Sequence, residues 1–156
     1  MKDSHWIYNG VPFTEAPDKA FGFVYRITNT KTGKKYLGRK QFESRRRKPL
    51  TKKQKDAGRV KRTVIKSESN WKEYTGSNTP LNEDIKNNTK NTFLFEILVV
   101  CYTKGQCNFV EETLQHKFNV VWDDSYYNDS VGSGKWMTVV LPEDVKTQIK
   151  IIDKTL

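Results

Sequence analysis

Every second residue from 21 to 27 is aromatic or aliphatic, so these side chains would share one face of an extended segment. A turn-rich stretch follows, and a second short extended segment begins at residue 35. The pattern predicts a β-hairpin. If its turn is four residues long, Tyr25 pairs with Gly38, and Tyr36 lies on the same face as Tyr25 as a diagonal neighbour.

Downstream, residues 93–102 are nearly all apolar and include β-branched members, as is typical of a central strand that is buried on both faces. Val110, Leu114 and Phe118 recur at helical spacing and predict a helix over residues 106–121.

Three further helices are predicted from caps, stops and apolar stripes. The first is a short helix over 67–74 with Trp71 and Tyr74 on one side. The second is capped by Ser77 or Asn78 and turns Leu81 and Ile85 inward. The last begins at Leu141 and has an apolar stripe of Val145, Ile149 and Ile152.

This order of elements in 156 residues predicts a small single α/β domain. We expect residues 1–20 to form a turn-rich N-terminal arm, anchored by Trp6 and its neighbours, and residues 21–128 to form the domain. Residues 129–156 would be a tail with a C-terminal helix. The tail suits packing or dimerisation, so a homodimer is one expected state.

Composition excludes several classes of protein. The longest apolar run, residues 97–102, is far too short to span a membrane, and the first residues lack the apolar stretch of a signal peptide. Two cysteines, Cys101 and Cys107, cannot cross-link a fold of this size. We therefore expect a cytoplasmic protein in a reducing environment, with no membrane partner.

Positive charge is concentrated in one segment. Residues 39–66 hold thirteen basic residues against two acidic ones, which accounts for the formal net charge of +10. Such a segment is either a solvated surface loop or a site for a polyanion, and its arginines favour nucleic acid over an anionic membrane. The candidate nucleic-acid-binding residues are Arg39, Lys40, Arg47, Lys48, Lys52, Lys53, Arg59, Lys61 and Arg62.

Candidate chemistry centres on the hairpin and on one carboxylate. Tyr25 and Tyr36 could be core aromatics, but Gly38 follows at a position where a missing Cβ permits close approach of a ligand. Glu111 lies about 60° from the centre of the apolar stripe of its helix. It would bind either an arginine or a divalent cation, and spacing alone favours the arginine.

Zinc is not expected, because the cysteines and histidines show no paired ligand spacing. Cys101 and Cys107 are predicted to be core thiols, and His5 and His116 surface imidazoles. The run of residues 132–134 is expected to be a linker rather than a phosphate-binding loop.

The segments Gly22–Lys40, with Phe23-Val24-Tyr25 followed by Tyr36-Leu37-Gly38, and Ser67–Ser77, with the later Tyr126-Tyr127-Asn128, resemble the GIY-YIG nuclease family. The likeness is to GIY-YIG proteins of tailed bacteriophages, some of them homing-type endonucleases. It covers roughly Trp6 to Asn128. A phage-encoded chain would act in the cytoplasm of the host cell.

The resemblance implies a three-stranded antiparallel sheet flanked by helices, with a basic insertion, and DNA cleavage that uses one Mg²⁺ or Mn²⁺ ion. It also implies roles for six residues. Tyr25 and Tyr36 would be the motif tyrosines, Glu111 (rather than Glu112) the metal ligand, Asn128 a residue bordering the site, and Arg45 or Arg46 the essential arginine on a helix after the second motif.

The chain departs from the family pattern in three ways. Phe23 stands where glycine is usual, no histidine matches the one that some members place near the site, and the basic segment is longer. A tyrosine with a pKa of about 10 is a poor base, so we expect nearby lysine, arginine and metal to lower that pKa.

The leading hypothesis is a Mg²⁺-dependent endonuclease whose partner is DNA, with RNA as a second substrate class. The alternative is a non-catalytic nucleic-acid-binding protein that uses the same fold and basic segment. A third hypothesis is a virion or host-interaction protein that needs no nucleic acid.

Overall fold

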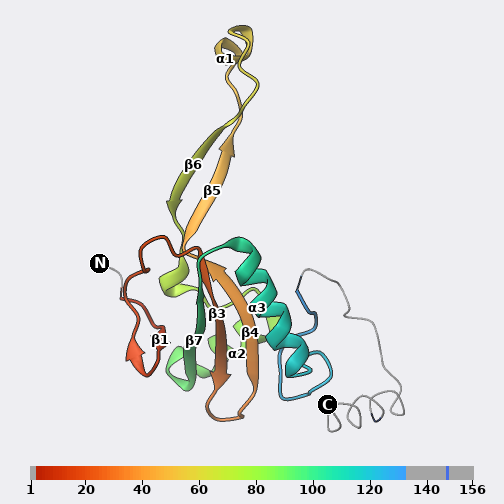
Figure 1. The fold of residues 1–156 in the computed structure, drawn as a ribbon. Coiled ribbons are helices and arrows are strands. Elements are labelled where there is room, and N and C mark those ends of the chain that lie inside the picture. Colours follow the sequence, from red (N-terminus) through yellow and green to blue (C-terminus); the bar gives the residue numbers. More distant parts are fainter. Residues whose placement is uncertain (1–2, 133–146, 148–156) are drawn as a thin grey trace.

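A computed structural model describes residues 3–132 and residue 147 (Figure 1). The elements are β1 (Ile7–Tyr8), β2 (Val11–Pro12), β3 (Gly22–Asn29), β4 (Lys35–Gln41), β5 (Glu43–Lys48), α1 (Lys52–Asp56), β6 (Thr63–Glu68), η1 (Trp71–Glu73), α2 (Thr79–Asn88), η2 (Lys90–Thr92), β7 (Phe93–Cys101) and α3 (Lys104–Lys117). The predicted helix from Leu141, with Val145, Ile149 and Ile152, lies outside the described residues.

The central sheet has the order β2-β1-β7-β3-β4 among the described residues. The expected three-stranded antiparallel sheet is present as β7-β3-β4. The prediction was wrong about the extent of the sheet, because β1 pairs in parallel with β7 and β2 pairs with β1. Trp6 holds this N-terminal hairpin in place, since its side chain is fully buried in the core.

The β3–β4 hairpin has the predicted register. Tyr25 pairs with Gly38 and Ile27 pairs with Tyr36, so the side chains of Tyr25 and Tyr36 lie on the same face. The four-residue turn is closed by the Asn29 amide, which donates to the Lys34 carbonyl over 2.8 Å. The alternation of apolar and polar positions was therefore sufficient to predict this hairpin.

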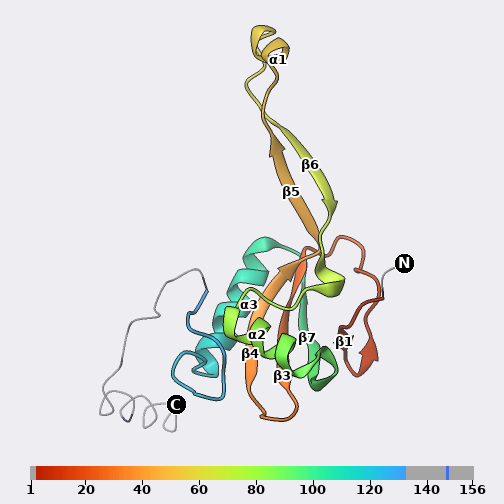
Figure 2. The ribbon, with the colours of Figure 1, turned by 180° about the vertical axis from the view of Figure 1, so that it is seen from behind.

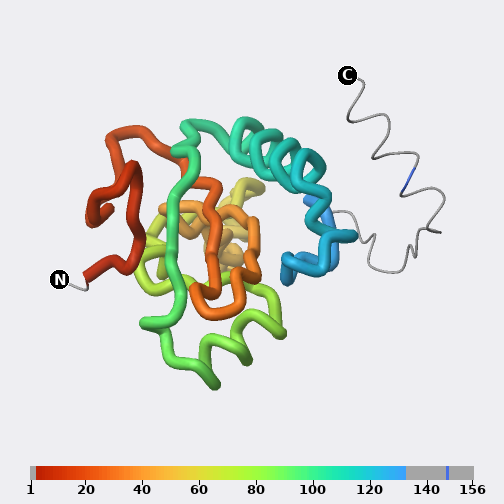
Figure 3. Tube along the Cα trace, turned by 90° about the horizontal axis from the view of Figure 1, so that it is seen from below, coloured from red at the N-terminus to blue at the C-terminus, as the bar shows by residue number. Residues whose placement is uncertain are grey.

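Helices cover both faces of the sheet (Figures 1, 2 and 3). On one face α2 and η1 enclose the main aromatic core, which includes Trp6, Phe23, Trp71 and Leu81. On the other face α3 packs over a small cluster formed by Val24 with the two cysteines. Cys101 and Cys107 are buried free thiols, as predicted.

Helix α3 packs on the sheet with the predicted residues Val110 and Leu114, which are partly buried against the Val24 cluster. Cys107 and Gln115 are its buried residues, whereas Phe118 is 44% exposed. The prediction for Phe118 was wrong because the helix ends at Lys117, where the chain turns away from the sheet. Glu111 lies one turn from Cys107 and so faces the sheet.

The predicted short helix over 67–74 was also wrong. Residues up to Glu68 belong to β6, and only Trp71–Glu73 form a 3₁₀ turn. By contrast, α2 begins as expected: the side chain of Asn78 accepts from the Leu81 amide over 2.9 Å, and Leu81 is buried.

The basic segment forms a two-stranded antiparallel ribbon that projects from the domain and carries α1 at its tip (Figure 1). We call residues 43–68 the basic ribbon. All residues of β6 are exposed, and only Ser44 of β5 is partly covered. None of the helices in residues 3–132 is long and apolar enough to cross a membrane.

Candidate active site

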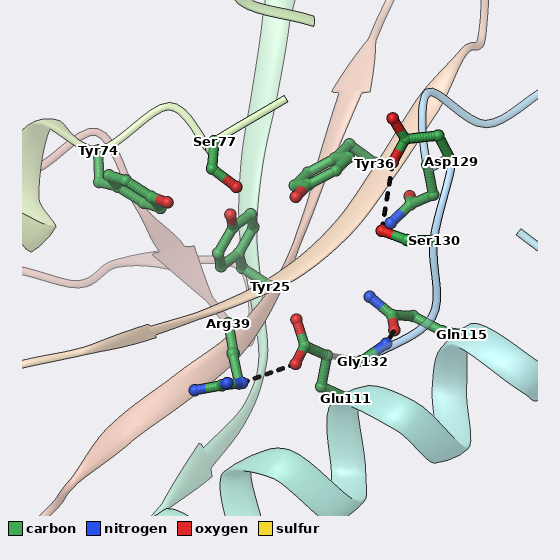
Figure 4. A pocket seen from close by; sticks show the side chains of 11 residues that line it. Tyr25, Tyr36, Arg39, Tyr74, Ser77, Glu111, Gln115, Asp129, Ser130 and Gly132 are labelled. Atoms are coloured by element: carbon green, nitrogen blue, oxygen red, sulfur yellow. Dashed lines mark hydrogen bonds and ion pairs between the residues drawn. The ribbon is translucent and has the colours of Figure 1, made fainter. Parts of the chain in front are cut away.

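A pocket of about 310 Å³ opens beside β4, the last strand of the sheet. We call it the tyrosine pocket. Its lining residues come from five separate parts of the chain (Figure 4). They are Tyr25, Tyr36, Arg39, Tyr74, Ser77, Glu111, Gln115, Asn128, Asp129, Ser130 and Gly132.

Side chains from both faces of the sheet meet in this pocket. Tyr25 and Tyr36 lie on the face that α2 covers, whereas Arg39 pairs with Val24 on the face that α3 covers. The outer edge of β4 carries no further strand among the described residues, only a single bridge between Lys35 and Tyr126. Phenols from one face of the sheet and the Glu111 carboxylate from the other converge beside this edge.

Three phenols form one wall of the pocket. Tyr25 is only 1% exposed, and its ring centroid lies 6.2 Å from those of Tyr36 and Tyr74. The hydroxyls of Tyr25, Tyr36 and Tyr74 point toward the side chain of Ser77 (Figure 4). A β-bulge on β7 opposite Val24 and Tyr25 shifts the register at the point where Tyr25 turns toward the pocket.

Burial keeps the phenols of Tyr25 and Tyr36 neutral. It raises the pKa of Tyr25 well above its usual value of 10.0, and the nearby Tyr36, Tyr74 and Glu111 raise it further. Burial also raises the pKa of Tyr36, although the hydrogen bond with Ser77 opposes that shift. The expectation that lysine and arginine lower the pKa of these tyrosines was therefore wrong for the described residues, because desolvation dominates and the neighbouring phenols and Glu111 raise the pKa as well. Its part that concerns a metal ion stays a prediction.

Gly38 makes room for the rings rather than for a ligand. A Cβ at this position would lie 2.6 Å from the hydroxyl oxygen of Tyr25 and 2.9 Å from Cε1 of Tyr36. A Cβ atom does not come this close to non-bonded atoms, so the two rings can cross β4 only where the strand lacks a side chain.

Glu111 makes the predicted salt bridge and also lines the pocket. Its Oε2 accepts from Arg39 Nε over 2.7 Å, and its side chain is only 12% exposed. The other carboxylate oxygen points into the pocket (Figure 4). Burial raises the pKa of Glu111, and the adjacent Arg39 opposes that shift.

Asn128 fastens the far wall of the pocket to β4. Its Oδ1 accepts from the Leu37 amide over 2.9 Å, and its Nδ2 donates to the Leu37 carbonyl over 2.8 Å. Gln115 of α3 donates to the same carbonyl over 3.2 Å. Asn128 thus borders the site, as the resemblance implied, and its side-chain amide is engaged with the backbone.

Arg45 and Arg46 do not reach the pocket. Both lie on β5 and are exposed, and neither is on a helix, so the expected helix after the second motif was wrong. A run of three arginines and a lysine has no apolar face to pack on the sheet, and the chain continues outward as a strand after Phe42. The pocket arginine is Arg39.

The other candidate nucleic-acid-binding residues divide into two groups. Arg39 and Lys40 lie on β4 and are partly buried, and the Lys40 Nζ lies 4.0 Å from the ring centroid of Tyr74. Arg47, Lys48, Lys52, Lys53, Arg59, Lys61 and Arg62 are all exposed on the basic ribbon.

The pocket atoms that could bind a metal ion are the oxygens of a carboxylate, of phenols and of hydroxyls. Such oxygen ligands suit Mg²⁺ or Mn²⁺ better than a softer metal. Glu111 is the carboxylate that points into it, and the exposed Asp129 lies at its rim. No group of three or more histidine, cysteine or acidic side chains in the described part of the chain could hold a metal ion by itself. Water and phosphate oxygens would therefore complete the coordination of any bound cation.

Sequence reasoning missed several pocket residues: Tyr74, Ser77, Gln115, Asp129, Ser130 and Gly132. Two signals could have found some of them. Gln115 lies four residues after Glu111 and so shares its helix face, and Tyr74 and Ser77 belong to the Ser67–Ser77 stretch that resembled other proteins. Gly132 was expected in a linker, but its amide donates to Gln115 Oε1 over 2.7 Å.

The histidine prediction was wrong for His5. Its ring packs 3.9 Å, centroid to centroid, from Phe95, and its Nε2 lies 3.0 Å from the Tyr74 carbonyl oxygen. His116 is exposed, as predicted.

Comparison with protein families gives one match. A family model described as "Putative endonuclease segE, GIY-YIG domain" matches residues 6–131. No curated protein and no solved structure matches the chain. The matched range begins in the N-terminal hairpin and includes every residue of the tyrosine pocket except Gly132.

Proposed function

Because this chain belongs to the GIY-YIG domain family of the segE endonuclease, we propose that it hydrolyses phosphodiester bonds of DNA in the tyrosine pocket, with a divalent cation held at Glu111. One observation carries this proposal. Two hairpin phenols, a largely buried carboxylate and a guanidinium converge on one pocket beside the outermost strand of the sheet.

Glu111 is the group suited to hold the cation. One of its oxygens is fixed by Arg39, and the other points into the pocket. A bound Mg²⁺ would lower the pKa of a coordinated water and neutralise charge on the scissile phosphate.

Arg39 has two tasks in this proposal. Its Nε orients the Glu111 carboxylate, and a guanidinium has four further N–H groups that can donate to a phosphate oxygen. Positive charge aimed at oxygens that become more negative in the transition state accelerates phosphoryl chemistry. Arg39 therefore takes the place that we first assigned to Arg45 or Arg46.

Tyr25 and Tyr36 act in this proposal as hydrogen-bond donors rather than as bases. Their pKa values are raised by burial, so both hydroxyls keep their protons at neutral pH. A neutral phenol can orient the attacking water and donate to a phosphate oxygen. Tyr74 and Ser77 line the pocket beside these two hydroxyls.

The first test is plasmid cleavage with Mg²⁺, with and without EDTA, by the full chain and by Glu111→Gln. We expect EDTA to stop cleavage and Glu111→Gln to lose about 10²-fold or more in rate, as is typical when one group that stabilises transition-state charge is removed. DNA binding should persist. The matched control is Glu112→Gln, whose exposed side chain is the next in sequence and outside the pocket.

If Glu111→Gln cuts as fast as the parent, the assignment of the site is wrong. If the parent binds DNA but does not cut it with Mg²⁺ or Mn²⁺, the chain is a binding protein built on this fold.

A second test distinguishes a Tyr25 that donates a hydrogen bond from a Tyr25 that acts as a base. Tyr25→Phe should slow cleavage by about 10- to 10²-fold, as expected for the loss of one hydrogen bond to the reacting groups. The pH–rate profile of the parent should show no inflection from a tyrosine near neutral pH. The control is Tyr8→Phe, on the N-terminal hairpin and outside the pocket. A parent rate that rises tenfold per pH unit and flattens only in Tyr25→Phe would identify Tyr25 as a base instead.

A further inference from the structure

The basic ribbon is joined to the pocket strand without a flexible linker. Phe42 alone separates β4 from β5, and it is buried 5.1 Å, centroid to centroid, from the ring of Trp71. On the returning strand, the Ser69 amide donates to the Phe42 carbonyl over 2.8 Å, and its hydroxyl donates to the Gln41 carbonyl over 2.6 Å. The base of the ribbon is therefore fixed in the core.

Near this base Arg45 and Lys66 line a pocket with residues 16–21 of the domain, and beyond these two residues the ribbon is largely exposed. Its two strands are exposed along both faces, and α1 has no buried residue. An isolated two-stranded hairpin is only marginally stable in water, so the ribbon adds little to the stability of the fold. Its shape is instead suited to a partner.

Charge indicates the class of that partner. The ribbon holds eleven basic residues against three acidic ones, and so contributes most of the net charge of the chain. The cations lie on both faces: Arg45 and Arg47 point to one side with Lys66, and Arg46 and Lys48 point to the other. A flat phosphate surface would meet only one of these faces, whereas the walls and floor of a groove would meet both.

The dimensions agree with a groove. The major groove of B-DNA is about 12 Å wide and admits a two-stranded β-ribbon. Six paired residues at about 3.3 Å each give a ribbon roughly 20 Å long, which is more than enough to cross the groove. Each face also carries one exposed apolar side chain, Val64 on the face of Arg47 and Ile65 on that of Arg46, and the one that meets the floor could contact a thymine methyl group.

We propose that the basic ribbon enters the major groove of duplex DNA and contacts base edges there, while the lysines around α1 bind phosphates. The inference rests on the proposed function and extends it: the ribbon reads the site, and its rigid base sets which phosphate reaches the tyrosine pocket. The DNA-reading element is thus an insertion within the domain, rather than the tail that follows it.

The test measures binding in EDTA, where no cleavage occurs, so its outcome does not depend on the proposed chemistry. Three states of one 30-base-pair duplex are compared: unmodified, with bulky C5 substituents on its pyrimidines, and saturated with a minor-groove ligand such as netropsin. The bulky groups fill the major groove and should weaken binding by tenfold or more. Netropsin should change the affinity by less than threefold.

Ribbon variants locate the contacts. Arg45→Ala/Lys66→Ala removes one face and Arg46→Ala/Lys48→Ala removes the other, and we expect each pair to weaken binding by about 10- to 10²-fold at moderate salt. Lys104→Ala/Lys117→Ala removes two exposed cations from α3 and is the matched control. Circular dichroism confirms that each variant is folded.

Three results would overturn the proposal. Equal binding to unmodified and C5-substituted duplexes would mean that the ribbon holds phosphates alone. Competition by netropsin would place it in the minor groove. Loss of dimerisation in the ribbon variants, with unchanged DNA affinity, would mean that its partner is a second copy of the chain. If plasmid is not cut but groove binding is observed, only the proposed hydrolysis fails.

Discussion

The partly buried imidazole of His5 lies between Phe95 and the Tyr74 carbonyl. Burial, together with the positive charge of Lys90, lowers the pKa of this ring from 6.5 to about 4. His5 therefore stays neutral at pH values where an exposed histidine would be protonated. It supports the backbone at Tyr74, one of the pocket tyrosines.

This pKa shift predicts acid sensitivity. Between pH 6.5 and pH 4 the unfolded chain binds a proton at His5 and the folded chain does not, so the free energy of unfolding falls as the pH falls through this window. We expect His5 to account for about 1–2 kcal/mol of the loss, less than the full shift implies because the ring is partly exposed.

The measurement is the thermal midpoint of the parent and of His5→Gln at pH 7 and pH 4.5. Gln cannot titrate, so the variant should lose less stability on acidification than the parent. Parallel losses in the two proteins would contradict the shift.

Some residues of the candidate site could be predicted from the sequence. The roles of Tyr25, Tyr36 and Glu111 came from the resemblance to the GIY-YIG family, because the pattern alone allowed the phenols to be core aromatics and favoured a salt bridge for Glu111. Tyr74 and Asp129 were not predicted, because nothing local shows that a 3₁₀ turn and a segment after α3 come back to the same strand edge.

At the scale of elements, β4 depends on Gly38 more than on any packing side chain it presents. The rings of Tyr25 and Tyr36 occupy the space that a Cβ would need. Gly38→Ala should therefore force one ring out of place, destabilise the domain by about 1–3 kcal/mol and reduce cleavage more than this loss explains. Urea unfolding and plasmid cleavage measure the two effects.

Gly105→Ala is the control for this change. Gly105 lies in α3, where a Cβ would come no closer than 3.9 Å to the Thr103 hydroxyl, so alanine should be neutral or stabilise the helix by about 0.5–1 kcal/mol. If Gly38→Ala behaves like Gly105→Ala, the rings adjust freely and the pocket is less rigid than described.

Elements with a clear period could be predicted, and elements without one could not. Alternation over residues 21–28 gave both the hairpin and its register, and the run at 93–102 gave the central strand. The strands of the basic ribbon were missed because Arg45 to Lys48 are all polar, so no face of the strand differs from the other.

At the scale of the molecule, the N-terminal hairpin and the pocket share one core. Trp6 is fully buried, its ring centroid is 4.9 Å from that of Tyr25, and its indole N–H donates to the Trp71 carbonyl over 2.6 Å. Residues that we expected to form an arm therefore support the pocket strand and the base of the ribbon together.

Trp6→Ala should destabilise the protein by about 3–5 kcal/mol, the usual cost of removing a buried tryptophan. Cleavage and DNA binding should fall together, because both depend on the same core. Urea unfolding gives the stability change. Phe109→Ala is the control, since its side chain is 73% exposed and its loss should cost less than about 0.5 kcal/mol. A mild effect of Trp6→Ala would show that the hairpin is dispensable.

The two hydrogen bonds between Asn128 and Leu37 complete the pocket with a residue that is synthesised after its other walls. The phenols, Arg39 and Glu111 all leave the ribosome before Asn128 does, so a nascent chain presents its basic residues while one wall of its cavity is still missing. Under the proposed function, a premature stop between α3 and Asn128 would yield a product that keeps the basic ribbon but lacks this wall, and we expect it not to cut DNA.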